Sequence, residues 1–159
     1  MPKLIFLVGL CGSGKTRKGN SMNSSSLFWA GEGIGSCTEK RLKLIEVLRI
    51  GIDCVAEEFL TFTDQQRTHL EMKIRGEYGI SPLLVVDFWF FEKDKEKARR
   101  NILSRPDGEK HHASHLALND LHFESYQIPE GAVVLEIEPP TEYVSPPRTS
   151  PAWSKRRDG

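Results

Sequence analysis

One segment near the N-terminus combines glycines, a lysine and a threonine at a spacing that suits phosphate chemistry. Residues 9–16 read Gly-Leu-Cys-Gly-Ser-Gly-Lys-Thr and fit G-x-x-x-x-G-K-[ST] at every fixed position. The glycines allow successive backbone N–H groups to turn inward around phosphate oxygens. We call residues 9–16 the phosphate loop.

Two side chains at the end of the phosphate loop add chemistry that the backbone lacks. Lys15 is a point charge that can reach the β- and γ-phosphates of a bound triphosphate, and the Thr16 hydroxyl can coordinate a Mg²⁺ that bridges them. The loop therefore predicts ATP and Mg²⁺ as cofactors. The predicted cofactor-binding residues are Gly9, Cys11, Gly12, Ser13, Gly14, Lys15 and Thr16.

The charges around the phosphate loop favour an anion, although the chain as a whole is neutral. No acidic residue precedes Glu32, whereas Lys3, Lys15, Arg17 and Lys18 do. The local field therefore favours a polyphosphate. Over the whole chain, 22 Lys and Arg residues balance 22 Asp and Glu residues, so a nucleic-acid partner is only weakly supported.

Strand and helix patterns alternate along the chain around this loop. Short apolar runs predict five strands, over residues 3–8, 27–30, 52–59, 82–91 and 132–137. Capping boxes and helical spacing predict four helices, from Ser36 to Gly51, from Thr63 to near Gly79, over residues 94–104 and over residues 113–121. Residues 14–26 are rich in weak helix formers and predict only one or two helical turns.

This alternation predicts an α/β fold, with a parallel sheet and helices on both of its faces. We expect residues 1–138 to form one domain. Residues 139–159 hold five of the nine prolines and a basic Lys-Arg-Arg end, which predicts a disordered tail.

The phosphate loop, the acidic strand end within residues 53–59 and the arginine-rich residues 91–106 resemble small P-loop kinases of the polynucleotide-kinase-like group. The resemblance extends over about residues 3–138. It implies a three-layer P-loop NTPase fold, with a five-stranded parallel sheet of order 2-3-1-4-5. It also implies an ATP-dependent kinase.

The resemblance further implies an acidic residue on the magnesium side of the site, for which Glu57, Glu58 and Asp87 are candidates. Glu57 and Glu58 fall near the carboxyl end of the third predicted strand, where open α/β sheets bind ligands. Adjacent strand residues face opposite ways, so only one of them can face the nucleotide. We expect Glu57 to hold the metal with Thr16, and Glu58 to be the second choice. Asp87 ranks lower because residues 88–91 continue its strand beyond it.

The remaining catalytic roles in this resemblance fall to a loop acid and two arginines. Glu32 follows the short second strand, where the family has a carboxylate that accepts or orients the proton of the acceptor hydroxyl. Residues 93–110 carry a net charge of +3 and resemble a phosphate-sensing lid. Within them, Arg100 and Arg105 match arginines that neutralise the transferred phosphoryl oxygens. The predicted catalytic residues are Lys15, Glu32, Arg100 and Arg105; an exposed glutamate and a solvated charged helix are the simpler alternatives.

Two functions fit these residues. In the first, an enzyme moves the γ-phosphoryl of MgATP to a hydroxyl acceptor, either a small molecule or a polynucleotide 5′ end. In the second, an ATP- or GTP-binding module hydrolyses its nucleotide slowly and acts as a switch or a partner-binding protein. The poor helical sequence after Thr16 favours the second function.

Cysteines and apolar runs indicate the compartment. Cys11, Cys37 and Cys54 are odd in number and lack C-x-x-C spacing, which fits free thiols in a reducing compartment. The longest apolar runs are too short to span a bilayer, so we expect no membrane partner. The N-terminus lacks the apolar core of a signal peptide, and we therefore expect a cytoplasmic protein.

Overall fold

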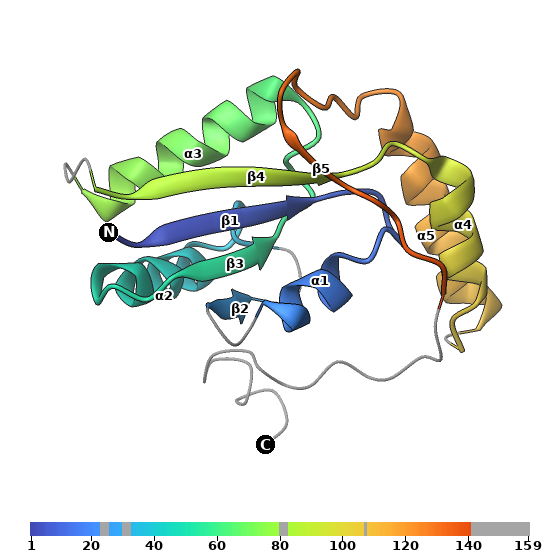
Figure 1. Ribbon diagram of the computed structural model, residues 1–159, viewed down its shortest axis with the longest axis horizontal. Coiled ribbons are helices and arrows are strands. Elements are labelled where there is room, and N and C mark those ends of the chain that lie inside the picture. Colours follow the sequence, from blue (N-terminus) through green and yellow to red (C-terminus); the bar gives the residue numbers. More distant parts are fainter. Residues whose placement is uncertain (23–25, 30–32, 80–82, 107, 141–159) are drawn as a thin grey trace.

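Strands and helices alternate in the computed structural model, which describes residues 1–22, 26–29, 33–79, 83–106 and 108–140 (Figure 1). The strands are β1 (Lys3–Val8), β2 (Leu27–Trp29), β3 (Cys54–Glu57), β4 (Val85–Phe91) and β5 (Val133–Leu135). The helices are α1 (Lys15–Ser21), α2 (Thr38–Arg49), α3 (Asp64–Tyr78), α4 (Lys95–Leu103) and α5 (Glu109–Phe123). No helix among these residues has the length and apolarity needed to cross a bilayer.

The strands form one parallel sheet in the order β2-β3-β1-β4-β5, which confirms the predicted fold class and sheet order. β1 is almost entirely apolar because it lies between two strands and is buried on both faces. In the register of the sheet, Leu7 of β1 lies beside Glu57 of β3, and Val8 lies beside Phe90 of β4. The phosphate loop therefore begins next to the carboxyl ends of both neighbouring strands.

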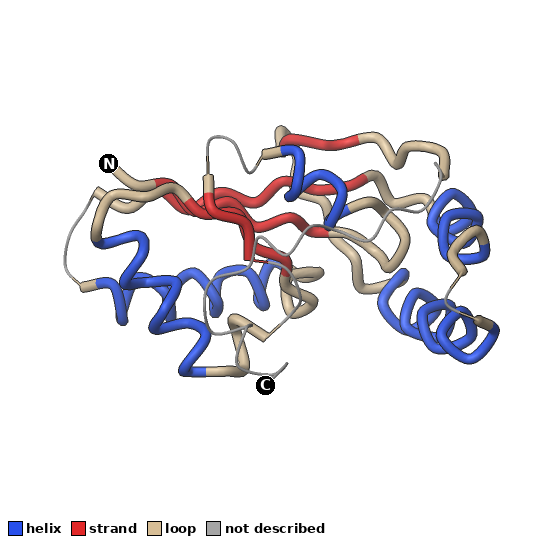
Figure 2. The backbone as a smooth tube through the Cα atoms, turned by 90° about the horizontal axis from the view of Figure 1, so that it is seen from below, coloured by secondary structure: helices blue, strands red, loops and turns tan. Residues whose placement is uncertain are grey.

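The helices form layers on the two faces of the sheet and a separate pair at its carboxyl edge (Figures 1 and 2). α2 and α3 cover one face, where Leu48 and Ile74 join Phe6 in a buried cluster. On the other face, beside α1, Phe28 packs with Leu7. α4 and α5 pack against each other beyond the ends of the strands, and we call them the helical pair.

α1 is short and lies very close to β2. It spans seven residues, which confirms the expected one or two turns after the phosphate loop. A Cβ atom at Gly19 would lie 2.2 Å from the ring of Phe28, so only glycine fits at this crossing. The glycine that weakens the helix is thus the residue that lets it approach the sheet.

One of the two predicted capping boxes is wrong. Thr63 and Gln66 form the expected box at the start of α3. At α2, by contrast, the N-cap is Cys37 rather than Ser36, and no side chain caps the helix. The chain enters α2 through a turn in which the Cys37 N–H donates to the Gly33 carbonyl at 2.7 Å, which moves the start of the helix by one residue.

Several other predicted bounds also shift. β3 ends at Glu57 instead of residue 59, because Glu58 enters a turn in which its carbonyl accepts from the Thr61 hydroxyl at 2.6 Å. α5 is longer than predicted at both ends, and β5 is shorter at both ends. Of the predicted strands, residue 30 and residue 82 lie outside the described residues, as do residues 141–159 of the predicted tail.

Candidate functional site

The phosphate loop joins the carboxyl end of β1 to the first turn of α1 and packs against α4. Gly12 has a φ of 83°, and a Cβ atom there would lie 2.4 Å from the Ala98 carbonyl oxygen of α4. A side chain at this position would meet both backbone strain and a steric clash. Gly12 therefore allows the loop to bend sharply in direct contact with the helical pair.

Lys15 lies across the phosphate loop and is only 8% exposed. Its Nζ donates to the Gly9 carbonyl at 2.8 Å and lies 4.6 Å from the centroid of the Phe59 ring. Both partners are neutral, and within the described residues no carboxylate forms an ion pair with Lys15. A positive charge held in this way favours the arrival of an anion.

Thr16 and Glu57 meet at the carboxyl ends of β1 and β3. The Thr16 hydroxyl donates to Glu57 Oε1 at 2.6 Å, and Glu57 is 4% exposed. A hydroxyl and a carboxylate are the hard oxygen ligands that Mg²⁺ prefers. The donor set therefore fits a magnesium ion beside the phosphate loop.

The two other candidate acids are engaged elsewhere. Glu58 is 3% exposed and accepts from the backbone N–H groups of Gly33, Gly35 and Leu60, at 3.3, 2.9 and 3.3 Å. Asp87 is the third residue of β4, and its carboxylate lies 3.1 Å from Lys3 Nζ near the opposite end of the sheet. Of the three acids, only Glu57 is brought to the phosphate loop.

The carbonyl groups that lead into the phosphate loop and form its first half are all occupied by hydrogen-bond donors. Each carbonyl of residues 8–12 accepts at least one hydrogen bond, so these oxygens, the negative ends of the peptide dipoles, are already paired. The donors are Tyr126 Oη to Val8, Lys15 Nζ to Gly9, the Ser13 N–H to Leu10, Asn119 Nδ2 to Cys11 and Asn101 Nδ2 to Gly12. A loop whose carbonyls are held in this way can offer its remaining N–H groups to an anion.

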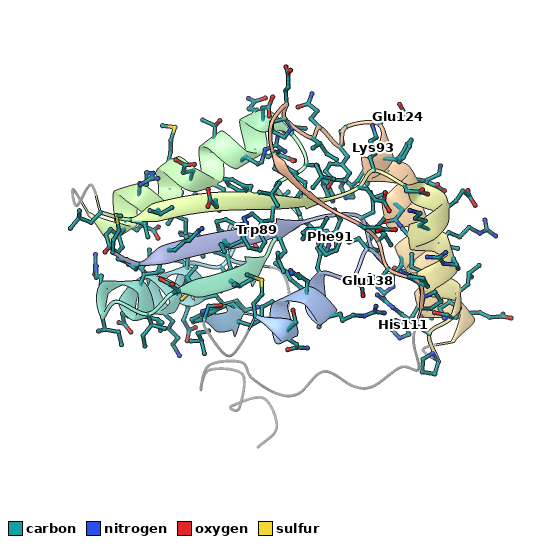
Figure 3. The ribbon with its side chains drawn as sticks, in the orientation of Figure 1. Trp89, Phe91, Lys93, His111, Glu124 and Glu138 are labelled. Atoms are coloured by element: carbon teal, nitrogen blue, oxygen red, sulfur yellow. The ribbon has the colours of Figure 1, made fainter. Side chains whose placement is uncertain are left out.

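A cavity of about 280 Å³ opens beside the phosphate loop. Ser13, Gly14 and Asn101 line it with polar groups, and Phe91 adds an aromatic ring at the end of β4 (Figure 3). Glu138, which follows β5, also lines the cavity, and its carboxylate accepts from Arg17 at 2.9 Å. A cavity of this size, with one ring and several polar groups, suits the base and sugar of a nucleotide whose phosphates extend into the loop.

An aromatic cluster lies on the other side of Lys15. The His122 ring of α5 stacks on Phe62 with centroids 4.7 Å apart, and on Phe59 with centroids 6.4 Å apart. Burial, and then the charge of Lys15, lower the pKa of His122 below its ordinary value of 6.5. The ring is therefore neutral at pH 7, and it packs as an aromatic group rather than as a second cation.

The two predicted arginines lie on α4 and just after it. Ala98 and Asn101 contact Gly12, whereas Arg100 is exposed and lies about 100° around α4 from Asn101 and about 200° from Ala98. Arg105 is half-buried and lies two residues beyond the end of α4. Glu32 lies outside the described residues.

Three residues at this site escaped the sequence reasoning: Asn119, Tyr126 and Glu138. Each contacts a residue that is more than 100 positions away in the chain. The local signal is the polarity of Asn119, which directly follows the apolar residues 116–118 of α5 and is 2% exposed in the structure. A buried amide in a helix needs partners, but nothing in the sequence shows where they are.

Comparison with known proteins finds similarity in structure but not in sequence. No family model matches the chain, and no curated protein matches its sequence. A gluconokinase from Sinorhizobium meliloti 1021 has a TM-score of 0.53 at 15% identity, covering 87% of this chain and 85% of its own. A sugar kinase from Janibacter sp. HTCC2649 has a TM-score of 0.58 at 16% identity, covering 88% and 87%.

A fungal RNA kinase is also similar, with a TM-score of 0.54 at 10% identity, covering 94% of this chain and 82% of its own. These matches include nearly the whole length of each protein. The chain therefore has the fold of these kinases, which confirms the fold that the sequence resemblance implied.

Proposed function

We propose that this chain is an ATP-dependent phosphotransferase that moves the γ-phosphoryl of MgATP to a hydroxyl acceptor. The observation that carries the proposal is the 2.6 Å hydrogen bond between Thr16 and Glu57, beside the buried ammonium group of Lys15, which donates to the neutral Gly9 carbonyl. Thr16 and Glu57 supply oxygen ligands for a metal, and Lys15 supplies a positive charge for phosphates, at the same edge of the sheet.

Each part of the site has a role in this proposal. The backbone of residues 9–16 binds the phosphates, and Lys15 leaves the Gly9 carbonyl to contact the β- and γ-phosphates. Thr16 and Glu57 hold Mg²⁺, which neutralises charge on the phosphates when bound. The cavity beside Phe91 takes the nucleoside.

The transfer step needs a proton acceptor, for which Glu32 is our candidate. The acceptor hydroxyl attacks the γ-phosphorus, the bond from the γ-phosphorus to the β–γ bridging oxygen breaks, and the hydroxyl proton passes to the Glu32 carboxylate. Arg100 and Arg105 are proposed to neutralise charge on the transferred oxygens. The similar folds belong to a gluconokinase, a sugar kinase and an RNA kinase, so the acceptor is either a small molecule or a polynucleotide.

A transfer assay tests the proposal. The protein is incubated with γ-labelled ATP, Mg²⁺ and separate acceptors, including sugars, gluconate and a 5′-hydroxyl oligoribonucleotide, and labelled products are resolved. We expect label on one acceptor class with the wild type and none with Lys15→Ala, which should still melt cooperatively. Absence of label on every acceptor argues against the kinase function.

Glu32→Gln separates transfer from binding. We expect the affinity for MgATP to be retained and the transfer rate to fall by about 10²- to 10⁴-fold, because the glutamine cannot take the proton. The matched control is Glu39→Gln, which removes an exposed carboxylate that lies 3.8 Å from Lys43 Nζ. Equal transfer rates in the two variants would show that Glu32 is not the proton acceptor.

A nucleotide-binding module with slow hydrolysis is the second candidate, and the length of α1 favours it. Seven residues give the phosphate loop only two helical turns of support on the sheet. In the same assay this function predicts label released only as inorganic phosphate.

We also propose that the protein acts in the cytoplasm, as one domain over residues 1–138 with a tail over residues 139–159. Cys37 and Cys54 are free thiols, which suits a reducing compartment.

A further inference from the structure

Asn119 brackets the backbone of the phosphate loop from the side of the helical pair. Its Oδ1 accepts from the Cys11 N–H at 2.8 Å, and its Nδ2 donates to the Cys11 carbonyl at 2.9 Å. The side chain is 2% exposed, so water does not compete for these bonds. For this one residue, Asn119 supplies the two bonds that a neighbouring strand would supply in a sheet.

The bracket fixes the direction of the Cys11 peptide groups. A carboxamide has its donor and its acceptor in one plane, so a pair of bonds to the N–H and carbonyl of one residue fits only one orientation. Asn101 continues the grip at the next residue, where its Nδ2 donates to the Gly12 carbonyl at 2.9 Å. Without these amides, the glycine-rich backbone around Gly12 would have many accessible conformations.

We propose that Asn119 is a positioning residue for phosphate binding. It holds the Cys11 peptide groups so that the phosphate loop keeps its binding conformation before the ligand arrives, and it does not itself contact the nucleotide. A loop ordered in advance loses less conformational entropy on binding. The inference rests on the proposed function, because it requires the phosphate loop to bind a triphosphate.

The variant Asn119→Asp tests this role because its hydrogen-bonding capacity changes with pH. An ionised aspartate accepts from the Cys11 N–H but cannot donate to the Cys11 carbonyl, whereas a protonated aspartic acid does both, like asparagine. Burial raises the pKa of a carboxyl, which brings its protonation into the range of about pH 5 to 8. Lowering the pH should therefore restore the lost hydrogen bond in the same variant.

The experiment measures the MgATP dissociation constant by calorimetry. The constant of each variant is divided by the constant of the wild type at the same pH. For Asn119→Asp we expect binding about 10- to 100-fold weaker at pH 8 and within about threefold of the wild type at pH 5. The common reference removes the titration of ATP and of His122 from the comparison. Circular dichroism at the same temperature confirms that each variant is folded.

Two controls separate positioning from general stability. Asn119→Ala loses both hydrogen bonds at every pH, so we expect it to bind weakly at pH 8 and at pH 5. Ile74→Val weakens the cluster under α3 without contact to the phosphate loop, so it should bind MgATP like the wild type. A purely structural role predicts that the folded Asn119 variants behave like Ile74→Val.

The outcomes distinguish this inference from the function it rests on. If the wild type binds MgATP, two results overturn the role of Asn119 alone. One is that Asn119→Asp binds MgATP as tightly as the wild type at pH 8. The other is that Asn119→Asp binds weakly at pH 8 and does not recover its affinity at pH 5. A wild-type protein that binds no MgATP overturns the proposed function, and this inference with it.

Discussion

Glu57 and Glu58 are adjacent in the chain but belong to two different regions of the molecule. Both are almost fully buried. Glu57 accepts from the Thr16 hydroxyl, which can rotate toward another partner, whereas Glu58 is surrounded by backbone N–H groups of its own chain. Glu57 faces a region that can receive a ligand, and Glu58 completes a region that is already closed.

Charged side chains hold this second region together. The Arg41 guanidinium forms a bidentate pair with Glu77, at 2.7 and 2.8 Å, and donates to the carbonyls of Ile34 and Gly35. Lys73 also donates to the Gly35 carbonyl, at 3.2 Å. The comparison shows that the end of a strand can place one acid in a binding site while the next residue, at the start of the following turn, belongs to the scaffold.

The largest effect is expected for Glu57→Gln, and it should appear only when Mg²⁺ is present. In Glu57→Gln the amide oxygen can still accept from Thr16, but the negative charge beside the metal is lost. We expect the affinity for MgATP to fall by about 100-fold and the affinity for ATP without Mg²⁺ to stay the same. Calorimetry with and without Mg²⁺ measures both; an equal fall in the two would assign Glu57 to the scaffold, like its neighbour.

A smaller and different effect should follow from Glu58→Gln. The amide group turns one acceptor into a donor that faces backbone N–H groups, which costs about 1 to 2 kcal/mol of unfolding free energy. The Mg²⁺ dependence of ATP binding should not change. Urea unfolding and calorimetry on the same variant test the two statements, and a selective loss of Mg²⁺ dependence here would exchange the roles of the two acids.

The smallest effect concerns a carboxylate at the same edge that is partly exposed. Glu92 accepts from Lys97 at 2.7 Å and from the Ile137 N–H at 3.0 Å, and these contacts lower the pKa of Glu92 below its ordinary value of 4.5. A lowered folded-state pKa stabilises the protein above about pH 4.5, and this contribution is lost as the pH falls through the folded-state pKa.

Glu92→Gln should therefore shift the urea midpoint slightly at pH 7 and by less at pH 3, because the contribution of the carboxylate is lost as the pH falls through its lowered folded-state pKa. Solvent screens this exposed pair, so the shift should be smaller than that of Glu58→Gln. A shift of the same size at both pH values would mean that packing, rather than charge, explains the contribution of Glu92.

Much of this arrangement was predictable because it depends on local pattern. The motif located the phosphate loop, apolar runs located the strands, and strand alternation predicted that only one of Glu57 and Glu58 faces the nucleotide, with Glu57 as the first choice. The rank of Asp87 below Glu57 likewise followed from its place within a strand that continues. These inferences needed only the geometry of one element at a time.

The parts that could not be predicted depend on contacts between distant elements. The phase of α4 decides that Asn101, and not Arg100, meets the phosphate loop, and that phase is set by the packing of Ala98 against Gly12. Asn119 reaches Cys11 across 108 positions of sequence. No spacing within one helix contains this information, and the same holds for the turn that displaced the cap of α2 from Ser36.

The contact between Gly12 and the Ala98 carbonyl has a mechanical consequence. Asn101 and Asn119 hydrogen-bond to the same stretch of backbone, so the phosphate loop is bound to both helices of the helical pair, and a hinge at the start of α4 would have to break the bond from Asn101 to open. If the proposed kinase function holds, a cation such as Arg105 would approach the γ-phosphate by rotation of its own side chain, rather than by the swing of a whole helix.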